Sequence, residues 1–200
     1  MKRLLDIMAI LIFSLLLIIL SLVTSFFLVV LTGFPILFRQ ERAGRSKSPF
    51  ILYKFRTMKA GTDSFGPSPR DGADPRLTRL GRFLRASSLD ELPQFWNVLR
   101  GDMSLVGPRP LYLEQAKEWN ERQRRRLEVL PGITGLAQIK GRGSLTLEEK
   151  LEFDVIYVEN QSFWLDVKII LLTVFLTFGG GGIYEKKYSQ GEKTRGRGKQ

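Results

Sequence analysis

Two adjacent carboxylates, Asp90 and Glu91, stand out as residues that could do chemistry. They lie in the segment Ser88-Leu89-Asp90-Glu91-Leu92-Pro93. Proline is tolerated only in the first turn of a helix, so Pro93 predicts a helix start close to Asp90. Helix capping by Ser88 or by Asp90 would account for this local pattern. A helix N-terminus also binds phosphate through its free N–H groups and its dipole, so a phosphate site is the alternative.

The residue types that the chain lacks narrow the possible chemistry. Among its 200 residues there is no histidine and no cysteine, which excludes an imidazole base, thiolate metal sites and disulfides. Catalysis must therefore use carboxylates, hydroxyls, Lys, Arg, Tyr or an oxygen-bound hard cation. The net charge of +11 favours polyanionic partners, namely nucleic acid, anionic lipid or phosphorylated substrates.

Several arginines lie in or next to predicted turns. Arg85, Arg109 and Arg142 are the ones that neighbouring segments could bring to the carboxylates. A carboxylate, a Mg²⁺ ion and arginine are the minimum set for phosphoryl chemistry without histidine. Arg79 and Arg82 precede Arg85 at a spacing of three, and this basic stripe is either a solvated face or a surface that meets phosphates.

The N-terminal segment predicts a membrane anchor. The uncharged run from Ile7 to Leu31 is longer than the roughly 20 residues that cross a bilayer. It also exceeds the apolar core of a signal peptide, roughly 7–15 residues. The positive charges that follow it place the next domain in the cytoplasm. A simple span would carry Lys2 and Arg3 to the far side, whereas a helix that enters and leaves on one face would not, and both arrangements stay open at this point.

The remaining chain predicts a small domain of mixed elements. Residues 50–58 are expected to form a strand or extended segment, residues 61–75 a loop and residues 131–143 a Gly-rich loop. Helices are expected over residues 76–86, 89–100 and 111–128, and from the capping box of Thr146 and Glu149 onward. Residues 169–178 are too short an apolar run to span a membrane and suit either a core or an interfacial helix. The parts are therefore a membrane-embedded helix (1–35), a cytoplasmic domain (36–178) and a Gly-rich linker with a basic disordered tail (179–200).

Two further acidic residues need an explanation. Asp154 lies on the predicted apolar face of the helix that starts at Thr146. A carboxylate in such a position must pair with an arginine or face a site. Asp102 follows Gly101 and is either a metal ligand or the acid of a turn, and we favour the turn. The arginines at 122, 124, 125 and 126 suit the C-terminus of the helix predicted over 111–128.

A set of motifs appears in a recognisable order. They are Lys54-Phe55-Arg56-Thr57-Met58, Ser88-Leu89-Asp90-Glu91-Leu92-Pro93-Gln94, Asn97-Val98-Leu99-Arg100-Gly101-Asp102-Met103-Ser104, Val106-Gly107-Pro108-Arg109-Pro110 and Pro131-Gly132-Ile133-Thr134-Gly135. This order resembles the bacterial sugar transferase family, the monotopic phosphoglycosyl transferases of the small single-domain type. The resemblance implies an α+β, mainly helical fold with a re-entrant N-terminal membrane helix, a small cytoplasmic domain and amphipathic interfacial helices.

The resemblance also implies a reaction. Asp90 would be the nucleophile that attacks the β-phosphate of a UDP-sugar and expels UMP, with Glu91 as its dyad partner. The covalent phosphosugar would then pass to polyprenyl (undecaprenyl) phosphate. Asp90 and Glu91 are the expected Mg²⁺ ligands. The residues expected to bind substrate phosphates are Lys54, Arg56, Arg85, Arg109 and Arg142, with Asp154 as a partner of Arg85, Arg109 or Arg142.

One feature departs from the family pattern, and other functions stay open. Small members carry a Ser-Pro pair that kinks the membrane helix, whereas the run from Ile7 to Leu31 has no proline. Its serines and threonine can bend a helix only less sharply. The expected location is the cytoplasmic face of the bacterial inner membrane, among membrane lipids and with downstream glycosyltransferases as candidate partners.

The alternative functions are a lipid-phosphate phosphatase or transferase of another class, and a non-catalytic basic module. Nucleic acid is disfavoured as a partner because the basic residues adjoin Gly/Pro turns and carboxylates.

Overall fold

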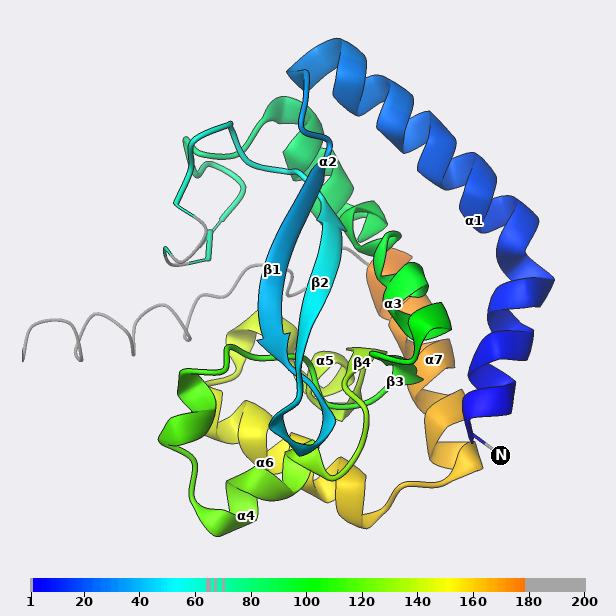
Figure 1. The fold of residues 1–200 in the computed structure, drawn as a ribbon, viewed down its shortest axis with the longest axis vertical. Coiled ribbons are helices and arrows are strands. Elements are labelled where there is room, and N and C mark those ends of the chain that lie inside the picture. The colour runs from blue at the N-terminus through cyan, green and yellow to red at the C-terminus, as the bar shows by residue number, and fades with distance from the viewer. Residues whose placement is uncertain (1, 64–65, 67, 70, 179–200) are drawn as a thin grey trace, which may run out of the picture.

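The computed structural model describes residues 2–63, 66, 68–69 and 71–178, and is a mainly helical α+β structure with one long helix along its side (Figure 1). This confirms the expected α+β, mainly helical class. The predicted linker and basic tail, residues 179–200, lie outside the described residues.

A β-hairpin forms the centre of the domain (Figure 1). Strand β1 (Leu37–Ala43) pairs antiparallel with β2 (Pro49–Phe55), with Phe38 opposite Lys54. Leu52 and Phe55 lie three residues apart and point to opposite faces of β2, and both are buried, so each face of the strand contributes to the core. Lys54 lies on the same face as Leu52. The extended segment expected over 50–58 is thus confirmed as a strand through Phe55.

A second, parallel sheet corrects one expectation. Strands β3 (Ser104–Val106) and β4 (Gly132–Thr134) pair side by side, and β4 leads into helix α5 (Leu136–Lys140). The prediction of a Gly-rich loop over 131–143 was therefore wrong. The glycines serve close backbone packing: a Cβ on Gly132 would lie 2.1 Å from the Gly107 nitrogen. Only glycine permits two backbones to approach this closely.

The helix expected over 76–86 is present in a shortened form. Helix α2 (Arg79–Ala86) begins at Thr78, whose hydroxyl accepts a hydrogen bond from the Gly81 nitrogen at 2.8 Å. Leu84 is buried, whereas the neighbouring Phe83 is 60% exposed.

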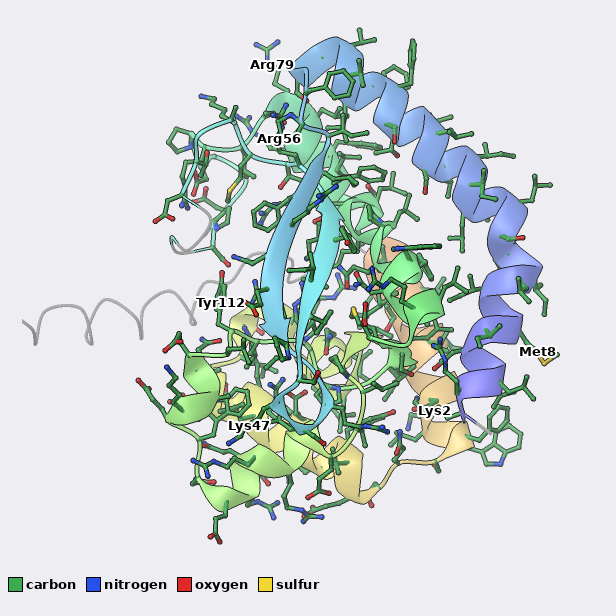
Figure 2. All side chains as sticks on the ribbon, viewed as in Figure 1. Lys2, Met8, Lys47, Arg56, Arg79 and Tyr112 are labelled. Carbon is green, nitrogen blue, oxygen red and sulfur yellow. The ribbon has the colours of Figure 1, made fainter. Side chains whose placement is uncertain are left out.

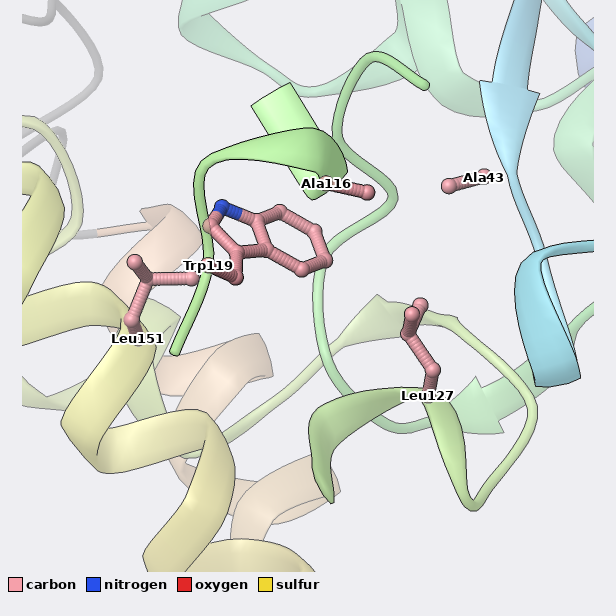
Figure 3. Close-up of a cluster of buried hydrophobic side chains, with 5 residues drawn as sticks. All are labelled: Ala43, Ala116, Trp119, Leu127 and Leu151. Atoms are coloured by element: carbon pink, nitrogen blue, oxygen red, sulfur yellow. The ribbon is translucent and has the colours of Figure 1, made fainter. Parts of the chain in front are cut away.

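The prediction of one polar helix over 111–128 was also wrong. The segment instead contains short separate pieces: a 3₁₀ turn at Gln115–Lys117, helix α4 (Glu121–Arg124) and a 3₁₀ turn at Arg125–Leu127. The chain bends so that its apolar residues reach one cluster, in which the Trp119 ring lies between Ala116 and Leu151 (Figure 3). Burying these side chains outweighs the local preference for a continuous helix.

Two helices complete the domain. Helix α6 (Leu147–Glu159) starts at the predicted capping box, in which the Thr146 hydroxyl and the Glu149 carboxylate each bind the other's backbone nitrogen. Helix α7 (Phe163–Phe178) contains the apolar run expected over 169–178. Ile169 is fully buried whereas Phe175 is 75% exposed, so part of this helix joins the core and the interfacial role stays a prediction.

Helix α1 (Lys2–Thr32) is the one described helix long and apolar enough to cross a membrane. A narrow stripe of this helix packs on the domain, at Asp6, Ile10, Thr24 and Leu28. The remaining faces expose leucine, isoleucine and phenylalanine, and Figure 2 shows Met8 pointing away from the domain. The buried Asp6 carboxylate accepts hydrogen bonds from β3, at 2.8 Å from the Ser104 hydroxyl and at 3.3 Å from the Leu105 nitrogen.

Both ends of α1 contact this same domain (Figures 1 and 2). At its N-terminal end, Lys2 forms an ion pair with Asp166 of α7 and donates a hydrogen bond to the Tyr157 hydroxyl at 3.1 Å. At its C-terminal end, the Arg56 guanidinium donates to the carbonyls of Thr32 at 2.6 Å and Gly33 at 2.7 Å. The helix therefore lies along the domain instead of leading away from it.

Candidate active site

Asp90 and Glu91 lie in a 3₁₀ turn, Leu89–Glu91, ahead of the following helix. Helix α3 (Gln94–Arg100) starts only after Pro93, and Ser88 adopts a left-handed backbone with φ 58°. In the described part of the chain, neither the Ser88 nor the Asp90 side chain caps this helix. The capping interpretation of the carboxylate pair therefore does not hold.

The Glu91 carboxylate is fixed by two cations. Its Oε1 accepts hydrogen bonds from Lys54 Nζ on β2 and from Arg109 Nη2 in the turn after β3, each at 2.8 Å. Burial alone would raise the pKa of Glu91, but Arg109 and Lys54 hold it well below its usual range. Glu91 is therefore ionised, and it ties the dyad to the strand and the turn.

The Asp90 carboxylate has different surroundings. It is buried, and it forms no hydrogen bond with any residue that the structure describes. Burial raises the pKa of Asp90 above its usual range, against the lowering effect of Lys54. A carboxylate that is shielded from water and from donors keeps its lone pairs free for an electrophile. The two neighbouring acids thus differ in their surroundings: Glu91 is fixed by two cations, whereas Asp90 is not.

Arg85 reaches the site from α2. Its Nε donates to the Thr57 hydroxyl at 2.9 Å, just beyond the end of β2. This contact depends on the close packing of α2, because a Cβ on Gly81 would lie 1.9 Å from the Thr57 carbonyl oxygen. Thr57 was missed as a site residue, although it lies inside the Lys54-to-Met58 motif.

The turn that carries Arg109 is held by backbone bonds and by a buried ion pair. Gly107 donates to the Thr134 carbonyl at 2.8 Å, and Gly132 donates to the Pro108 carbonyl at 2.9 Å. The carbonyl of Arg109 accepts a hydrogen bond from Arg126, whose guanidinium also binds Asp154 Oδ2 at 2.7 and 3.0 Å.

Asp154 therefore pairs with an arginine, as expected, but with a different one. Its partner is Arg126, and not Arg85, Arg109 or Arg142 as predicted. Arg126 had been assigned to a helix C-terminus, whereas its side chain is buried with its guanidinium 4.7 Å from the centre of the Trp119 ring. Because the expected helix is broken, Arg126 turns inward to face α6.

Arg142 reaches the site from the short turn that follows α5. It follows α5 in a left-handed conformation with φ 47°, and its Nη2 donates to the Thr177 hydroxyl on α7 at 3.0 Å. Burial lowers the pKa of Arg142, while the charge of Glu91 opposes and that of Arg109 reinforces this shift. The two arginines and Glu91 therefore influence one another electrostatically.

Two other predicted residues have mainly structural contacts. The hydrogen bonds of Arg56 go to the backbone at the C-terminal end of α1 and not to the dyad. Asp102 accepts from Asn97 Nδ2 at 3.2 Å beside Gly101, whose φ is 93°, so it is the acid of a turn.

One cavity of about 1110 Å³ brings the predicted residues together. Its lining includes every residue predicted to act in the site: Lys54, Arg56, Arg85, Asp90, Glu91, Arg109, Arg142 and Asp154. The volume suits a ligand larger than a phosphate ion. Four separate segments supply positive charge around the Asp90 carboxylate, an arrangement suited to a diphosphate.

The donor set fits Mg²⁺. The described residues contain no cluster of three acidic or imidazole ligands, but Mg²⁺ commonly uses one or two carboxylates together with substrate phosphates. Asp90 offers both oxygens, and Glu91 binds its two cations through Oε1 alone. The expected ligands therefore suit a metal that arrives with a phosphorylated substrate.

Comparisons with known proteins identify the family of this chain. The model of the family described as bacterial sugar transferase matches residues 1–180. The uncharacterized sugar transferase EpsL of Bacillus subtilis (strain 168) is 49% identical over 166 residues, which are 83% of this chain and 81% of EpsL. This chain belongs to the bacterial sugar transferase family.

Longer relatives carry more specific names. The galactosyl transferase CpsE of Streptococcus agalactiae serotype III is 44% identical, over 75% of this chain and 36% of CpsE. The UDP-glucose:undecaprenyl-phosphate glucose-1-phosphate transferase of Escherichia coli (strain K12) is 45% identical, over 75% of this chain and 34% of the relative. The chain thus spans about a third of these two proteins. The relatives support the predicted enzyme class, a phosphoglycosyl transferase, over a non-catalytic basic module.

Proposed function

We propose that this chain transfers a sugar 1-phosphate from a UDP-sugar to polyprenyl phosphate, releases UMP and so initiates glycan assembly on a lipid carrier. The observation that carries the proposal is the Asp90 carboxylate, buried and free of hydrogen bonds from described residues at the wall of a cation-lined cavity. The names of the Escherichia coli and Streptococcus agalactiae relatives support the substrate class.

In the first step, an Asp90 carboxylate oxygen attacks the phosphorus atom that bears the sugar. A bond forms between that oxygen and phosphorus, the bond from phosphorus to the bridging oxygen breaks, and UMP leaves with the bonding electrons. Arg109 and Arg142 are positioned to neutralise the charge that shifts onto the leaving phosphate. The product is an aspartyl phosphosugar.

In the second step, a phosphate oxygen of the polyprenyl phosphate attacks the same phosphorus atom. The bond to Asp90 breaks, which regenerates the carboxylate and leaves the sugar joined to the lipid through a diphosphate. Two steps at one site let a water-soluble donor and a membrane acceptor bind in turn. Glu91 does not react: it holds Lys54 and Arg109 around the phosphorus atom.

Asp90 and Glu91 would hold a Mg²⁺ ion together with the substrate phosphates. When bound, the metal supplies charge neutralisation to the diphosphate. Burial of Asp90 limits the access of water, which would otherwise hydrolyse the acyl phosphate.

We further propose that α1 is re-entrant, with the catalytic domain on the cytoplasmic face of the bacterial inner membrane. A helix of 31 residues is roughly 46 Å long, longer than the hydrocarbon core of about 30 Å. If α1 crossed the bilayer, its ends would lie on opposite sides, yet Lys2 and Thr32 both contact one polar domain. Exposed Trp96, Trp164 and Phe175 on α3 and α7 extend the apolar surface that α1 offers to lipid.

The proposal is tested by UMP release from a panel of UDP-sugars, with detergent-solubilised full-length chain and polyprenyl phosphate as acceptor. We expect UMP from at least one UDP-sugar with wild-type chain and none with Asp90→Asn. A lipid-phosphate phosphatase would instead liberate inorganic phosphate from the acceptor without consuming a UDP-sugar. That result would replace the proposed activity.

A further inference from the structure

The side chain of Gln138 is in an unusual state. It lies in α5 and is buried, with 9% of its surface exposed. Among the residues that the structure describes, it is the one side chain with two polar atoms that are both buried and without a hydrogen-bond partner. Proteins rarely bury an amide in this way, because the lost hydration is not replaced. Such a group calls for a functional reason.

The position of Gln138 gives one. It lines the same cavity as Asp90, on the wall formed by α5 and α7. Its Oε1 lies 3.0 Å from where a Cβ of Gly135 would be, and that Cβ would also be 2.2 Å from the Gly107 carbonyl oxygen. The amide is therefore beside the turn that presents Arg109, and Arg142 follows four residues later.

The chemistry of an amide differs from that of its neighbours. Arginine and lysine donate only, which suits phosphate, whereas a carboxamide offers a donor and an acceptor side by side. Its complement is a neutral group with the same pair of functions. In a UDP-sugar that description fits a sugar hydroxyl or the imide edge of the uracil ring, and it does not fit the diphosphate.

We propose that Gln138 binds the nucleotide-sugar donor through such a neutral donor–acceptor group and so contributes to substrate selection. This inference rests on the proposed function. Rotation about the side-chain torsions carries the amide from the cavity wall into the cavity, where both atoms gain partners. Because neither atom has a hydrogen-bond partner among the described residues, the hydrogen bonds gained on binding are not offset by hydrogen bonds to those residues that must break. A site built this way rejects an analogue that lacks the matching group.

The test compares Gln138→Met, which keeps the length of the side chain and removes the amide, with wild-type chain. Gln161→Met is the matched control, because Gln161 bonds to Tyr157 and is not among the residues lining the cavity. The affinities for UDP-glucose, UDP-galactose, UDP and UMP are measured by ligand-induced thermal stabilisation of the detergent-solubilised full chain. The unfolding temperature without ligand is recorded for each variant.

We expect Gln138→Met to weaken binding of UDP-sugars by about tenfold, while the ligand-free unfolding temperature is unchanged or higher. Equal weakening for UDP and UMP assigns the contact to uracil, and weakening for UDP-sugars alone assigns it to the sugar. Unchanged affinity for all four probes overturns the inference, as does a lower ligand-free unfolding temperature, which would mark a structural amide. Wild-type chain that binds none of the probes overturns the proposed function itself.

Discussion

Glu91 accepts a hydrogen bond from Arg109 at 2.8 Å, through the same oxygen that binds Lys54. This bond joins the carboxylate pair to a turn that follows a different sheet. It explains how two adjacent acids can act differently in one cavity: Glu91 is neutralised by two cations, while Asp90 is held close to the same charges without being bonded to them. The site thus combines one carboxylate that is bonded to two cations with one that lies near them unbonded, which agrees with the proposed division of roles.

Replacement of Lys54 by methionine should move the pH dependence of the first half-reaction. Asp90 attacks only when ionised, so kcat/KM for the UDP-sugar falls as the pH drops through the pKa of Asp90. Burial raises that pKa and the Lys54 charge lowers it. Lys54→Met removes the lowering effect, and we expect the acid limb of the pH profile to shift to higher pH.

Lys117→Met is the matched control, because Lys117 pairs with Glu114 on the exposed surface and is not among the cavity-lining residues. Its profile should overlay that of wild-type chain. An acid limb of Lys54→Met that lies at or below the wild-type position would contradict the assignment of that limb to Asp90.

The buried ion pair of Arg126 and Asp154 predicts a stability pattern. Asp154→Leu leaves the Arg126 charge buried and unpaired, so the free energy of unfolding should fall by about 3 kcal/mol. Adding Arg126→Met removes that charge and should recover most of the loss. Urea unfolding followed by tryptophan fluorescence measures both variants. In contrast, Glu152→Gln breaks an exposed pair with Arg122 and should hardly change the midpoint.

Catalysis by the double variant separates stability from positioning. Arg126 donates to the carbonyl of Arg109, so Arg126→Met with Asp154→Leu should remain folded but transfer sugar phosphate more slowly than wild-type chain. Full activity in that folded double variant would show that the Arg109 turn does not depend on Arg126.

The re-entrant arrangement can be tested with a single cysteine, because the chain has none of its own. A cysteine inserted after Met1 should react with a membrane-impermeant maleimide in inside-out vesicles and not in intact spheroplasts. A second cysteine at Lys117, in the domain, reports which face is cytoplasmic. Labelling of the two positions from opposite sides would mean that α1 spans the bilayer.

The residues that line the cavity could be predicted from sequence because they lie in short, ordered motifs. Asp90, Glu91, Arg109 and Lys54 each occupy a motif position, and the structure brings them to one cavity. The start of α6 was predictable for a local reason, since a capping box involves only residues three apart.

What could not be predicted depends on contacts between distant segments. Glycine-rich sequence reads as a loop, and nothing local reveals that Gly132 packs against Gly107 across two strands. The bend that turns Arg126 toward Asp154 follows from burying Trp119, a tertiary effect that overrides helix propensity. Asp6 lies next to the apolar run, and only the fold shows that its carboxylate binds β3.

Trapping of the covalent intermediate tests the central claim most directly. Full-length chain is incubated with Mg²⁺ and a UDP-sugar radiolabelled in the sugar, without polyprenyl phosphate, and is then denatured and separated from free nucleotide. We predict that wild-type chain retains label, releases an equal amount of UMP and loses the label when polyprenyl phosphate is added before denaturation. Asp90→Asn should retain none. Label on Asp90→Asn, or its full turnover, would contradict the assignment of Asp90 as the nucleophile.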